Sequence, residues 1–290
     1  MQEVKSYQLR PDQPFNLDLT LSSGQAFRWT HDGTWWIGYI YNDIIHIRQN
    51  GITLTYYGSN EDVIVRYFSL DQDLSTIYDT ISIDNVMKQA ITSARGLRLI
   101  RQDPWECMVC HICSNRSQRT SATDRITRIA EVLGTPATID HDLFFLFPTP
   151  FDIINASSYQ IRNCNLGHST HLHLIHLADL FVTNQEWLQQ LYRFPYQNLV
   201  HALHKIGGVS KNASEYIAFS AFGALEAFPV DGHIRDIFRV LYLKDRTIRY
   251  PDQQAQNHII QQEAQARFGR YAAYAFEYLF MTQDILKEFV

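Results

Sequence analysis

The first 80 or so residues follow the pattern of a half-buried β-sheet. Apolar residues alternate with polar ones over Phe15–Ser22, which is the period of a strand with one buried face. The dipeptides Asn42-Asp43 and Asn50-Gly51 favour tight hairpins. They separate three stretches rich in aromatic and β-branched residues: 35–41, 44–48 and 52–57. We therefore predict an antiparallel sheet in this part of the chain.

From about residue 83 the apolar positions take the spacing of amphipathic helices. Seven segments show it: 83–99, 103–114, 121–133, 171–183, 184–191, 196–204 and 271–287. Pro148, Pro150 and Gly167 mark loops between them. We predict an α+β fold with two domains, an antiparallel sheet domain over residues 1–83 and a mostly helical domain over residues 84–290.

The composition is that of a globular protein. Of the 290 residues, 46% are hydrophobic and 19% are charged, which is enough apolar material for a sizeable core. No apolar run approaches the roughly 20 residues that span a bilayer, and the N-terminus lacks the features of a signal peptide. Four Cys without a secretion signal indicate a reducing compartment. We expect an intracellular protein of the cytoplasm or nucleoid that does not associate with membranes.

The net charge of −5 gives no reason by itself to expect a nucleic-acid partner, but the charge is unevenly distributed. Residues 88–128 carry eight Lys or Arg against three Asp or Glu, whereas residues 1–87 carry five against eleven. A basic block in an acidic protein can form an anion-facing surface. A solvated helix face explains it as well, and charge alone favours this second interpretation.

A glycine turn between two predicted helices is the first candidate site. Its residues are Gly207, Gly208, Val209 and Ser210. Such a turn presents backbone N–H groups and a helix N-terminus, which can bind a phosphate without any side-chain charge. Helix hairpins also use glycine simply to turn, and the pattern on its own favours that interpretation.

Asp231 is the second candidate. It follows the apolar pair Pro229-Val230 and precedes a predicted helix, where Asp is a common N-cap. The alternative is a partly desolvated carboxylate aimed at a ligand over the preceding hairpin. The local sequence leaves both interpretations open.

Three stretches together resemble the helix–hairpin–helix DNA glycosylases, and within them the 8-oxoguanine DNA glycosylase branch. Ser23–Trp29 is similar to the N-terminal signature of that branch, and Gly96–Cys107 to the opening of its helical domain. The glycine hairpin followed by Pro229-Val230-Asp231 is similar to the hallmark of the superfamily. The resemblance implies a sheet domain packed on a helical domain that contains a helix–hairpin–helix motif, with the active site in the cleft between them.

The resemblance also implies an enzyme that flips one nucleotide out of double-stranded DNA and cuts its N-glycosidic bond. Asp231 then stabilises the oxocarbenium-like sugar, and the backbone carbonyl of Gly24 approaches the flipped base. His233 matches a family His that binds a phosphate near that nucleotide. We expect DNA as the partner of a monomeric protein.

The position of the nucleophile departs from the family pattern. Bifunctional members place a Lys nineteen residues before the Asp, and its amine forms a Schiff base with the sugar. That position holds Asn212 here, and the neighbouring Lys211 is rotated from it by about 100° on a helix. Lys211 fits only if the hairpin is one residue shorter. We favour a monofunctional enzyme in which Asn212 positions water; a bifunctional glycosylase/lyase that uses Lys211 is the alternative.

The base pocket implied by the resemblance is altered as well. Phe280 matches a stacking Phe, Phe276 replaces a Gln that reads the purine edge, and Tyr216 replaces a Cys. Phe27, in the N-terminal signature, belongs to the same predicted pocket. Replacing an amide by a ring removes hydrogen-bond readout and leaves stacking. Core packing is the alternative for these rings, but we favour the pocket for Phe276 and Phe280.

The segments that correspond to the family's readers of the opposite base also differ from the family pattern. Asn115, Arg116 and Arg119 lie in the family's asparagine-rich loop, and His168 lies where it has a paired arginine segment. These residues can still fill the gap left by flipping and contact phosphates. We predict altered specificity, for another lesion or for a modified base in foreign DNA. A module that binds such a base without cutting is the non-enzymatic alternative, against which Asp231 argues.

We expect no metal and no cofactor, and leave open only a monovalent cation at the hairpin. Cys107, Cys110 and Cys113 resemble an iron–sulfur run, but on one helix this spacing places them along a single buried stripe. The histidines from His168 to His176 match no established zinc pattern, and we expect them to form a helix face near DNA.

Overall fold

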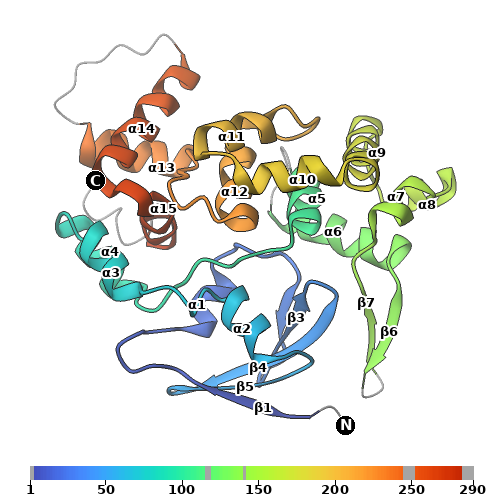
Figure 1. Ribbon diagram of the computed structural model, residues 1–290, viewed down its shortest axis with the longest axis horizontal. Coiled ribbons are helices and arrows are strands. Elements are labelled where there is room, and N and C mark those ends of the chain that lie inside the picture. The colour runs from blue at the N-terminus through green and yellow to red at the C-terminus, as the bar shows by residue number, and fades with distance from the viewer. Residues whose placement is uncertain (1–2, 115–118, 140–141, 244–251, 283–290) are drawn as a thin grey trace.

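The computed structural model describes residues 3–114, 119–139, 142–243 and 252–282, without the side chains of residues 119–121. A five-stranded antiparallel sheet forms the N-terminal layer, and a larger group of helices lies above it (Figure 1). The predicted α+β fold is confirmed.

The sheet has the strand order β1-β5-β4-β3-β2, with every neighbouring pair antiparallel. Tyr41 and Gly51 lie in the tight turns on either side of β4 and take left-handed backbone conformations, with φ of 54° and 57°. The strands are β1 (Lys5–Gln8), β2 (Trp29–His31), β3 (Trp36–Ile40), β4 (Asp43–Asn50) and β5 (Thr53–Tyr57). The strands and hairpins predicted over residues 35–57 are confirmed.

The strand predicted over Phe15–Ser22 is wrong, because Leu17–Ser22 is the helix α1. The side chain of Asn16 caps this helix by accepting a hydrogen bond from the N–H of Leu19 at 3.0 Å. Thr20, in the middle of the supposed polar face, is fully buried. Alternation over so few residues fits either structure, and the N-cap favours the helix.

The helical layer contains a helix within each of the seven predicted segments. Its elements are α4 (Asn85–Ser93), α5 (Pro104–Ser114), α6 (Arg119–Leu133), α7 (Pro150–Ile154), α8 (Ser158–Asn163), α9 (His168–Thr183), α10 (Gln185–Arg193), α11 (Tyr196–His204), α12 (Lys211–Phe222), α13 (Gly232–Ile237), a π-helical turn (Phe238–Tyr242), α14 (Gln253–Phe268), a 3₁₀ turn (Gly269–Tyr271) and α15 (Ala272–Met281).

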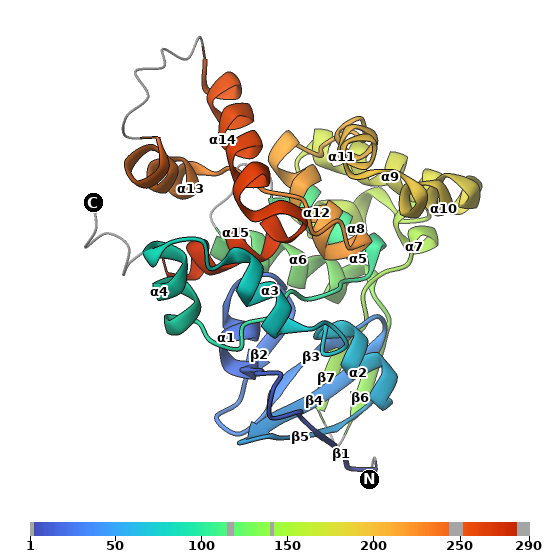
Figure 2. The same ribbon diagram turned by 60° about the vertical axis from the view of Figure 1, so that its left-hand side comes forward.

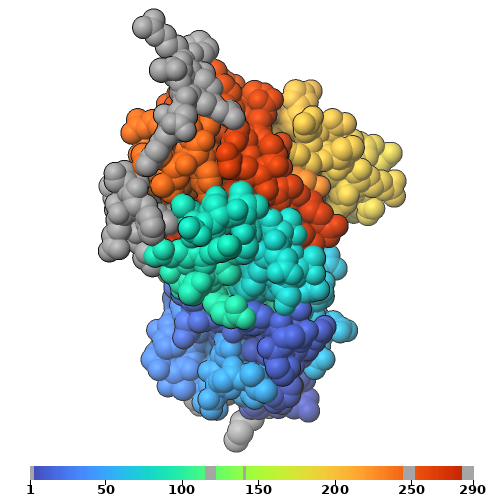
Figure 3. Space-filling view, turned by 90° about the vertical axis from the view of Figure 1, so that its left-hand side faces the viewer, coloured from blue at the N-terminus to red at the C-terminus, as the bar shows by residue number. Residues whose placement is uncertain are grey.

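Two helices before residue 83 did not stand out in the sequence pattern: α2 (Glu61–Tyr67) and α3 (Leu74–Ile81). Both α3 and α4 contact α15, and they lie between the sheet domain and the C-terminal helices (Figure 3). The main hydrophobic cluster accordingly includes Leu74, whereas the cluster of the sheet domain includes Leu70 and Ile100. The domain boundary at residue 83 stays a prediction.

The helix predicted over residues 83–99 ends early, at Ser93. Gly96 takes φ of 89°, and a Cβ there would lie 2.9 Å from backbone atoms of Phe15 and Asn16. The chain therefore leaves the helix and runs along the sheet domain before α5 begins. This close approach requires glycine at position 96.

Arg98, in that linking segment, corrects part of the interpretation of the basic block. Its side chain is 1% exposed, and its Nη1 donates to the carbonyl oxygens of Ser69 at 2.7 Å and Gln72 at 3.0 Å. Arg101, nearby, is paired with Asp71 at 2.8 Å. Arg98 therefore joins parts of the fold and cannot belong to an anion-facing surface.

A further hairpin, outside the five-stranded sheet and not revealed by the sequence pattern, reaches from the helical layer down beside the sheet domain (Figures 1 and 2). The ring of Phe144 lies edge-on to the ring of His46 of β4, with centroids 6.0 Å apart. The guanidinium of Arg28 donates to the carbonyl of Phe145 and lies 3.6 Å from the ring centroid of Tyr39. The hairpin consists of β6 (Pro136–Ile139) and β7 (Asp142–Phe145). Through these contacts it joins the sheet domain to the helical layer.

The cysteine stripe on α5 is confirmed, since Cys107, Cys110 and Cys113 are buried in the main hydrophobic cluster. Burial raises the pKa of the Cys113 thiol to about 12, which keeps it protonated. Within the described parts of the chain, no three His, Cys, Asp or Glu side chains gather as a metal-binding group. Nor does any helix described there have the length and apolar character to cross a membrane.

Candidate active site

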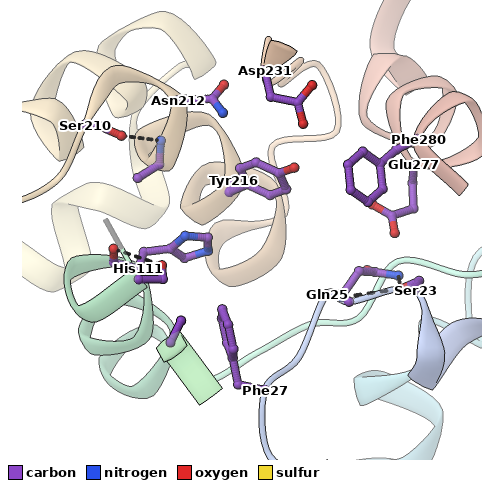
Figure 4. A pocket seen from close by; sticks show the side chains of 14 residues that line it. Ser23, Gln25, Phe27, His111, Ser210, Asn212, Tyr216, Asp231, Glu277 and Phe280 are labelled. Atoms are coloured by element: carbon purple, nitrogen blue, oxygen red, sulfur yellow. Dashed lines mark hydrogen bonds between the residues drawn. The ribbon is translucent and has the colours of Figure 1, made fainter. Parts of the chain in front are cut away.

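A cavity of about 430 Å³ lies where the sheet domain meets the helices (Figure 4). Its volume falls within the roughly 300–1,000 Å³ of ligand pockets in proteins. The sheet domain contributes the loop that follows α1, and the helical layer contributes α5, α6, α12, α15 and the start of α13. The lining residues are Ser23, Gly24, Gln25, Phe27, His111, Ser114, Ala122, Ser210, Asn212, Ala213, Tyr216, Asp231, Glu277 and Phe280.

Gln25 fixes the loop that carries the sheet domain's share of this pocket. Its amide nitrogen donates to the carbonyl of Arg98 at 3.0 Å, and its amide oxygen accepts from the N–H of Ile100 at 2.8 Å. Gly24, next to it, takes φ of 95°, which favours glycine. The loop is therefore tied to the segment between the domains, and Gly24 lines the pocket with backbone alone.

The predicted helix–hairpin–helix motif is formed by α11 and α12. Gly208 takes φ of 84° in the turn. A Cβ on Gly207 or Gly208 would lie 2.7 Å from the ring of His173, so glycine serves both the turn and the contact with α9.

The remaining hairpin residues lie at the start of α12. Ser210 caps the helix by accepting a hydrogen bond from the N–H of Ala213 at 3.1 Å, and it also lines the pocket. Val209 is buried. The hairpin thus adjoins the cavity, while its role in binding phosphate stays a prediction.

Asp231 and Asn212 lie next to each other at one edge of the cavity (Figure 4). The Oδ1 of Asp231 accepts a hydrogen bond from the N–H of Ile234 at 2.9 Å and caps α13. The Oδ1 of Asn212 accepts a hydrogen bond from the N–H of Val230 at 2.7 Å. The NH₂ group of Asn212 therefore points away from that N–H. The structure therefore shows Asp231 as an N-cap that also lines the cavity, and its action on a ligand stays a prediction.

Lys211 lies on the other side of α12. It lines a separate cavity of about 360 Å³ together with Tyr196, Glu215 and Gln261, between α11, α12 and α14. One helical position, about 100° of rotation, thus separates the Lys from the Asn that lines the main pocket. The structure places Asn212 beside Asp231 and does not bring Lys211 to them.

The aromatic residues predicted for the pocket divide into two groups. Phe27, Tyr216 and Phe280 line the cavity. Phe276, predicted to face the base, is 0% exposed and does not line it, which corrects that expectation. Its ring packs behind the wall, with its centroid 5.3 Å from that of Tyr216 and 5.8 Å from that of Phe280. Phe228 covers its other side, so Phe276 supports the rings that do line the pocket.

Two residues of the pocket with acidic or basic side chains were missed by the sequence reasoning, His111 on α5 and Glu277 on α15. The ring of His111 lies against the ring of Tyr216, with centroids 5.5 Å apart and an interplanar angle of 30°. Burial lowers the pKa of His111 to about 4, so the imidazole is neutral at physiological pH. Glu277 is 2% exposed. The only sequence signal for either was its place on a predicted helix.

Two of the remaining predicted DNA contacts have side chains that the structure describes, His168 and His233. His168 begins α9 and His233 lies in the first turn of α13, and both are exposed. Asn115 and Arg116 lie outside the described residues, as does the side chain of Arg119. The involvement of these five residues in DNA binding stays a prediction.

The chain is similar to known DNA glycosylases over most of its length. Residues 8–108 match the family model described as 8-oxoguanine DNA glycosylase, N-terminal domain. The N-glycosylase/DNA lyase OGG1 of Arabidopsis thaliana is 24% identical over 281 residues, which cover 92% of this chain and 77% of that protein.

Solved structures extend the similarity to the whole fold. The structure of MBOgg1 in complex with a low-affinity DNA ligand matches with a TM-score of 0.86 and 25% identity, over 99% of both chains. The 8-oxoguanine glycosylase/lyase of Clostridium acetobutylicum, bound to DNA with cytosine opposite 8-oxoguanine, matches with a TM-score of 0.85 and 23% identity, over 99% of this chain and 98% of that one.

Proposed function

Because the chain belongs to the 8-oxoguanine DNA glycosylase-like branch of the helix–hairpin–helix DNA glycosylases, we propose that it excises a damaged or modified base from double-stranded DNA. The base is flipped out of the duplex into the cavity between the two domains, and its N-glycosidic bond is hydrolysed there. Water is the nucleophile, so the enzyme is monofunctional and leaves an abasic site.

The juxtaposition of Asp231 and Asn212 over one pocket is the observation that carries this proposal. As the base departs, positive charge develops on the sugar, and a fixed carboxylate beside it stabilises the oxocarbenium-like transition state. Asp231 also accepts the proton of the attacking water. Because the amide oxygen of Asn212 is held by the N–H of Val230, its NH₂ group is oriented and can position that water.

The position of Lys211 argues against a lyase. A Schiff base requires the amine to reach C1′ of the sugar, which lies beside Asp231 when the base occupies the pocket. Lys211 instead lines a separate cavity together with Glu215. The bifunctional alternative would require α12 to rotate or the hairpin to be rebuilt.

In this proposal the protein binds DNA mainly through contacts with the DNA backbone. The hairpin at 205–210 and the start of α12 offer N–H groups to a phosphate next to the pocket that receives the base. The protein acts as a monomer. The Val209 carbonyl of the hairpin lies 3.1 Å from Nδ1 of His204. A monovalent cation at the hairpin stays a prediction.

Base release from a panel of duplexes tests the proposal. The full chain is incubated under single-turnover conditions with DNA that carries 8-oxoguanine, alkylated or hypermodified bases, opposite each of the four normal bases. We expect free base and an intact strand that breaks only on alkaline treatment, with no adduct trapped by borohydride. Tight binding without release from any duplex would instead support a module that recognises the base without cutting.

A further inference from the structure

Several polar side chains that line the cavity are already used within the fold. Ser23 donates to the carbonyl of Thr20 at 3.0 Å, and the amide of Gln25 bonds at both ends to the segment between the domains. Ser114 donates to the carbonyl of His111 at 3.2 Å. The hydrogen-bonding groups of these side chains therefore hold the wall of the pocket together.

The side chain of His111 differs from them. It projects from α5 into the pocket (Figure 4), while its neighbours Cys110, Ile112 and Cys113 are buried in the main hydrophobic cluster. Among the described residues it takes part in no hydrogen bond, and its ring contacts the ring of Tyr216. Because a polar ring is costly to bury without a hydrogen bond, a ligand that supplies one gains affinity.

The place of His111 along the pocket determines which part of a ligand it meets. Asn212, beside Asp231, marks the end where the sugar lies in the proposed function. Tyr216 follows one turn later on α12, about 5.4 Å further along the helix axis. The ring of His111 lies beyond it, with its centroid 5.5 Å from that of Tyr216 (Figure 4). A base that extends from the sugar along Tyr216 therefore presents its far edge to His111.

The imidazole has the chemistry of a hydrogen-bonding reader. Burial lowers the pKa of His111 to about 4, so its ring is neutral and offers one N–H donor and one acceptor nitrogen. Either an oxygen or an amino group on a base can bond to it. Phe276, at the position where the resemblance implies an amide reader, is 0% exposed and lies behind the wall. Hydrogen-bond readout of the base thus falls to another element, and α5 offers it.

Resting on the function proposed above, we propose that His111 is a specificity-determining residue that hydrogen-bonds to the edge of the flipped base farthest from the sugar. The pocket accepts a purine with an oxygen or amino group on that edge. It disfavours a base of the same shape without such a group, because the imidazole is then buried without a partner. The ring of Tyr216 lies against the imidazole and holds its orientation.

A matched pair of ligands tests this readout without cleavage. One duplex carries adenine at a single nucleotide, and the other carries 4-methylbenzimidazole, which has nearly the same shape and no polar group on that edge. In both, this nucleotide has a 2′-fluoro sugar, which slows hydrolysis, and stands opposite an abasic site, so that flipping breaks no base pair. We expect the wild-type protein to bind the adenine duplex about tenfold more tightly.

Two variants assign that preference to His111. His111→Phe keeps a ring against Tyr216 and removes the hydrogen bond, and we expect the preference to fall below about threefold. His258→Phe is the matched control, because His258 is an exposed histidine on α14 that lines the second cavity. The control should keep the tenfold preference. If His111→Phe does not fold, His111→Leu takes its place, and the same fall is expected there.

The outcomes separate this inference from the function on which it rests. Equal binding of the two duplexes by the wild-type protein, or an unchanged preference in the His111 variant, would overturn the readout by His111, even if the protein excises bases. An equal fall in His258→Phe would overturn it too, because the effect would then not belong to the pocket. Absence of base release from every duplex of the panel would overturn the proposed function itself.

Discussion

The two sides of α12 differ in the cavities that their polar side chains line. On one side Asn212 and, one turn later, Tyr216 line the pocket with Asp231. On the other side Lys211 and, one turn later, Glu215 line a second cavity. Both pairs have the same i, i+4 spacing, so the periodicity of the helix alone does not distinguish an active site from a structural cavity.

The hydrogen bonds make the distinction. The carboxyl group of Glu215 accepts from the hydroxyl of Tyr196 at 2.8 Å, from the amide of Gln261 at 3.0 Å and from the N–H of Phe228 at 3.2 Å. Its hydrogen-bonding capacity is used within the fold. Asp231, by contrast, uses one oxygen as an N-cap and presents its carboxylate to the cavity. One side of α12 therefore holds the fold together, and the other keeps polar groups for a substrate.

The largest expected effect comes from Asp231→Asn on the pocket side. Asn caps a helix as well as Asp, so α13 should keep its N-cap and the protein its stability. Base release should fall by at least about 10²–10³-fold, because the charge that stabilises the sugar cation is lost. Single-turnover excision and duplex binding, measured side by side, should show lost catalysis with retained affinity.

Asp252→Asn provides the control for this substitution. Asp252 caps α14 in the same way, by accepting a hydrogen bond from the N–H of Ala255 at 2.8 Å, and it is exposed away from the pocket. The Asp252→Asn variant should release the base at the wild-type rate. Excision that survives Asp231→Asn would show that the N-cap is the whole role of Asp231, and the proposed mechanism would be wrong.

The sequence was sufficient for the parts of this site that depend on local motifs. Asp231 and the glycine hairpin stand in a recognisable order, and Asn212 follows from counting residues between them. His111 and Glu277 could not be found in this way, since their place in the pocket depends on how α5 and α15 pack. Phe276 was misplaced for a related reason: α15 is buried on every side, so its pattern shows no polar face that would indicate which residue meets the cavity.

The same distinction holds for the fold. Segments with clear helical periodicity, such as 196–204, do contain a helix, whereas α1 and the hairpin of β6 and β7 are too short for periodicity to decide. Arg98 shows the limit of charge counting. A buried Arg that bonds to carbonyl oxygens and a surface Arg that binds phosphate look alike in a sequence.

Glu215→Gln, on the structural side, should change stability and leave excision within about threefold of wild type. Burial raises the pKa of Glu215 to about 7 from an ordinary value near 4.5. The folded state therefore binds this proton more tightly than the unfolded state, and its contribution to stability is present below about pH 4.5 and is lost as the pH rises to about 7. Gln carries no titratable proton, so the variant lacks this dependence of stability on pH. The stability of wild type relative to the variant should fall by about 1–3 kcal/mol from pH 5 to pH 7.5.

Urea unfolding at several pH values measures this difference. Glu186→Gln, at an exposed position of α10, is the control and should track the wild type at every pH. A difference between wild type and Glu215→Gln that does not change with pH would mean that Glu215 is ionised throughout. A large loss of excision in Glu215→Gln would show that both sides of α12 contribute to excision, contrary to the comparison.

Lys211→Ala should have the smallest effect and is the sharpest test of the comparison. The Lys211 side chain lines the second cavity, so neither excision nor the abasic product should change by more than about twofold to threefold. Borohydride trapping on lesion DNA, run for wild type and variant together, is the measurement. A covalent adduct in the wild type that disappears in Lys211→Ala would place the amine at the sugar, and α12 would then have to present Lys211, not Asn212, to the substrate.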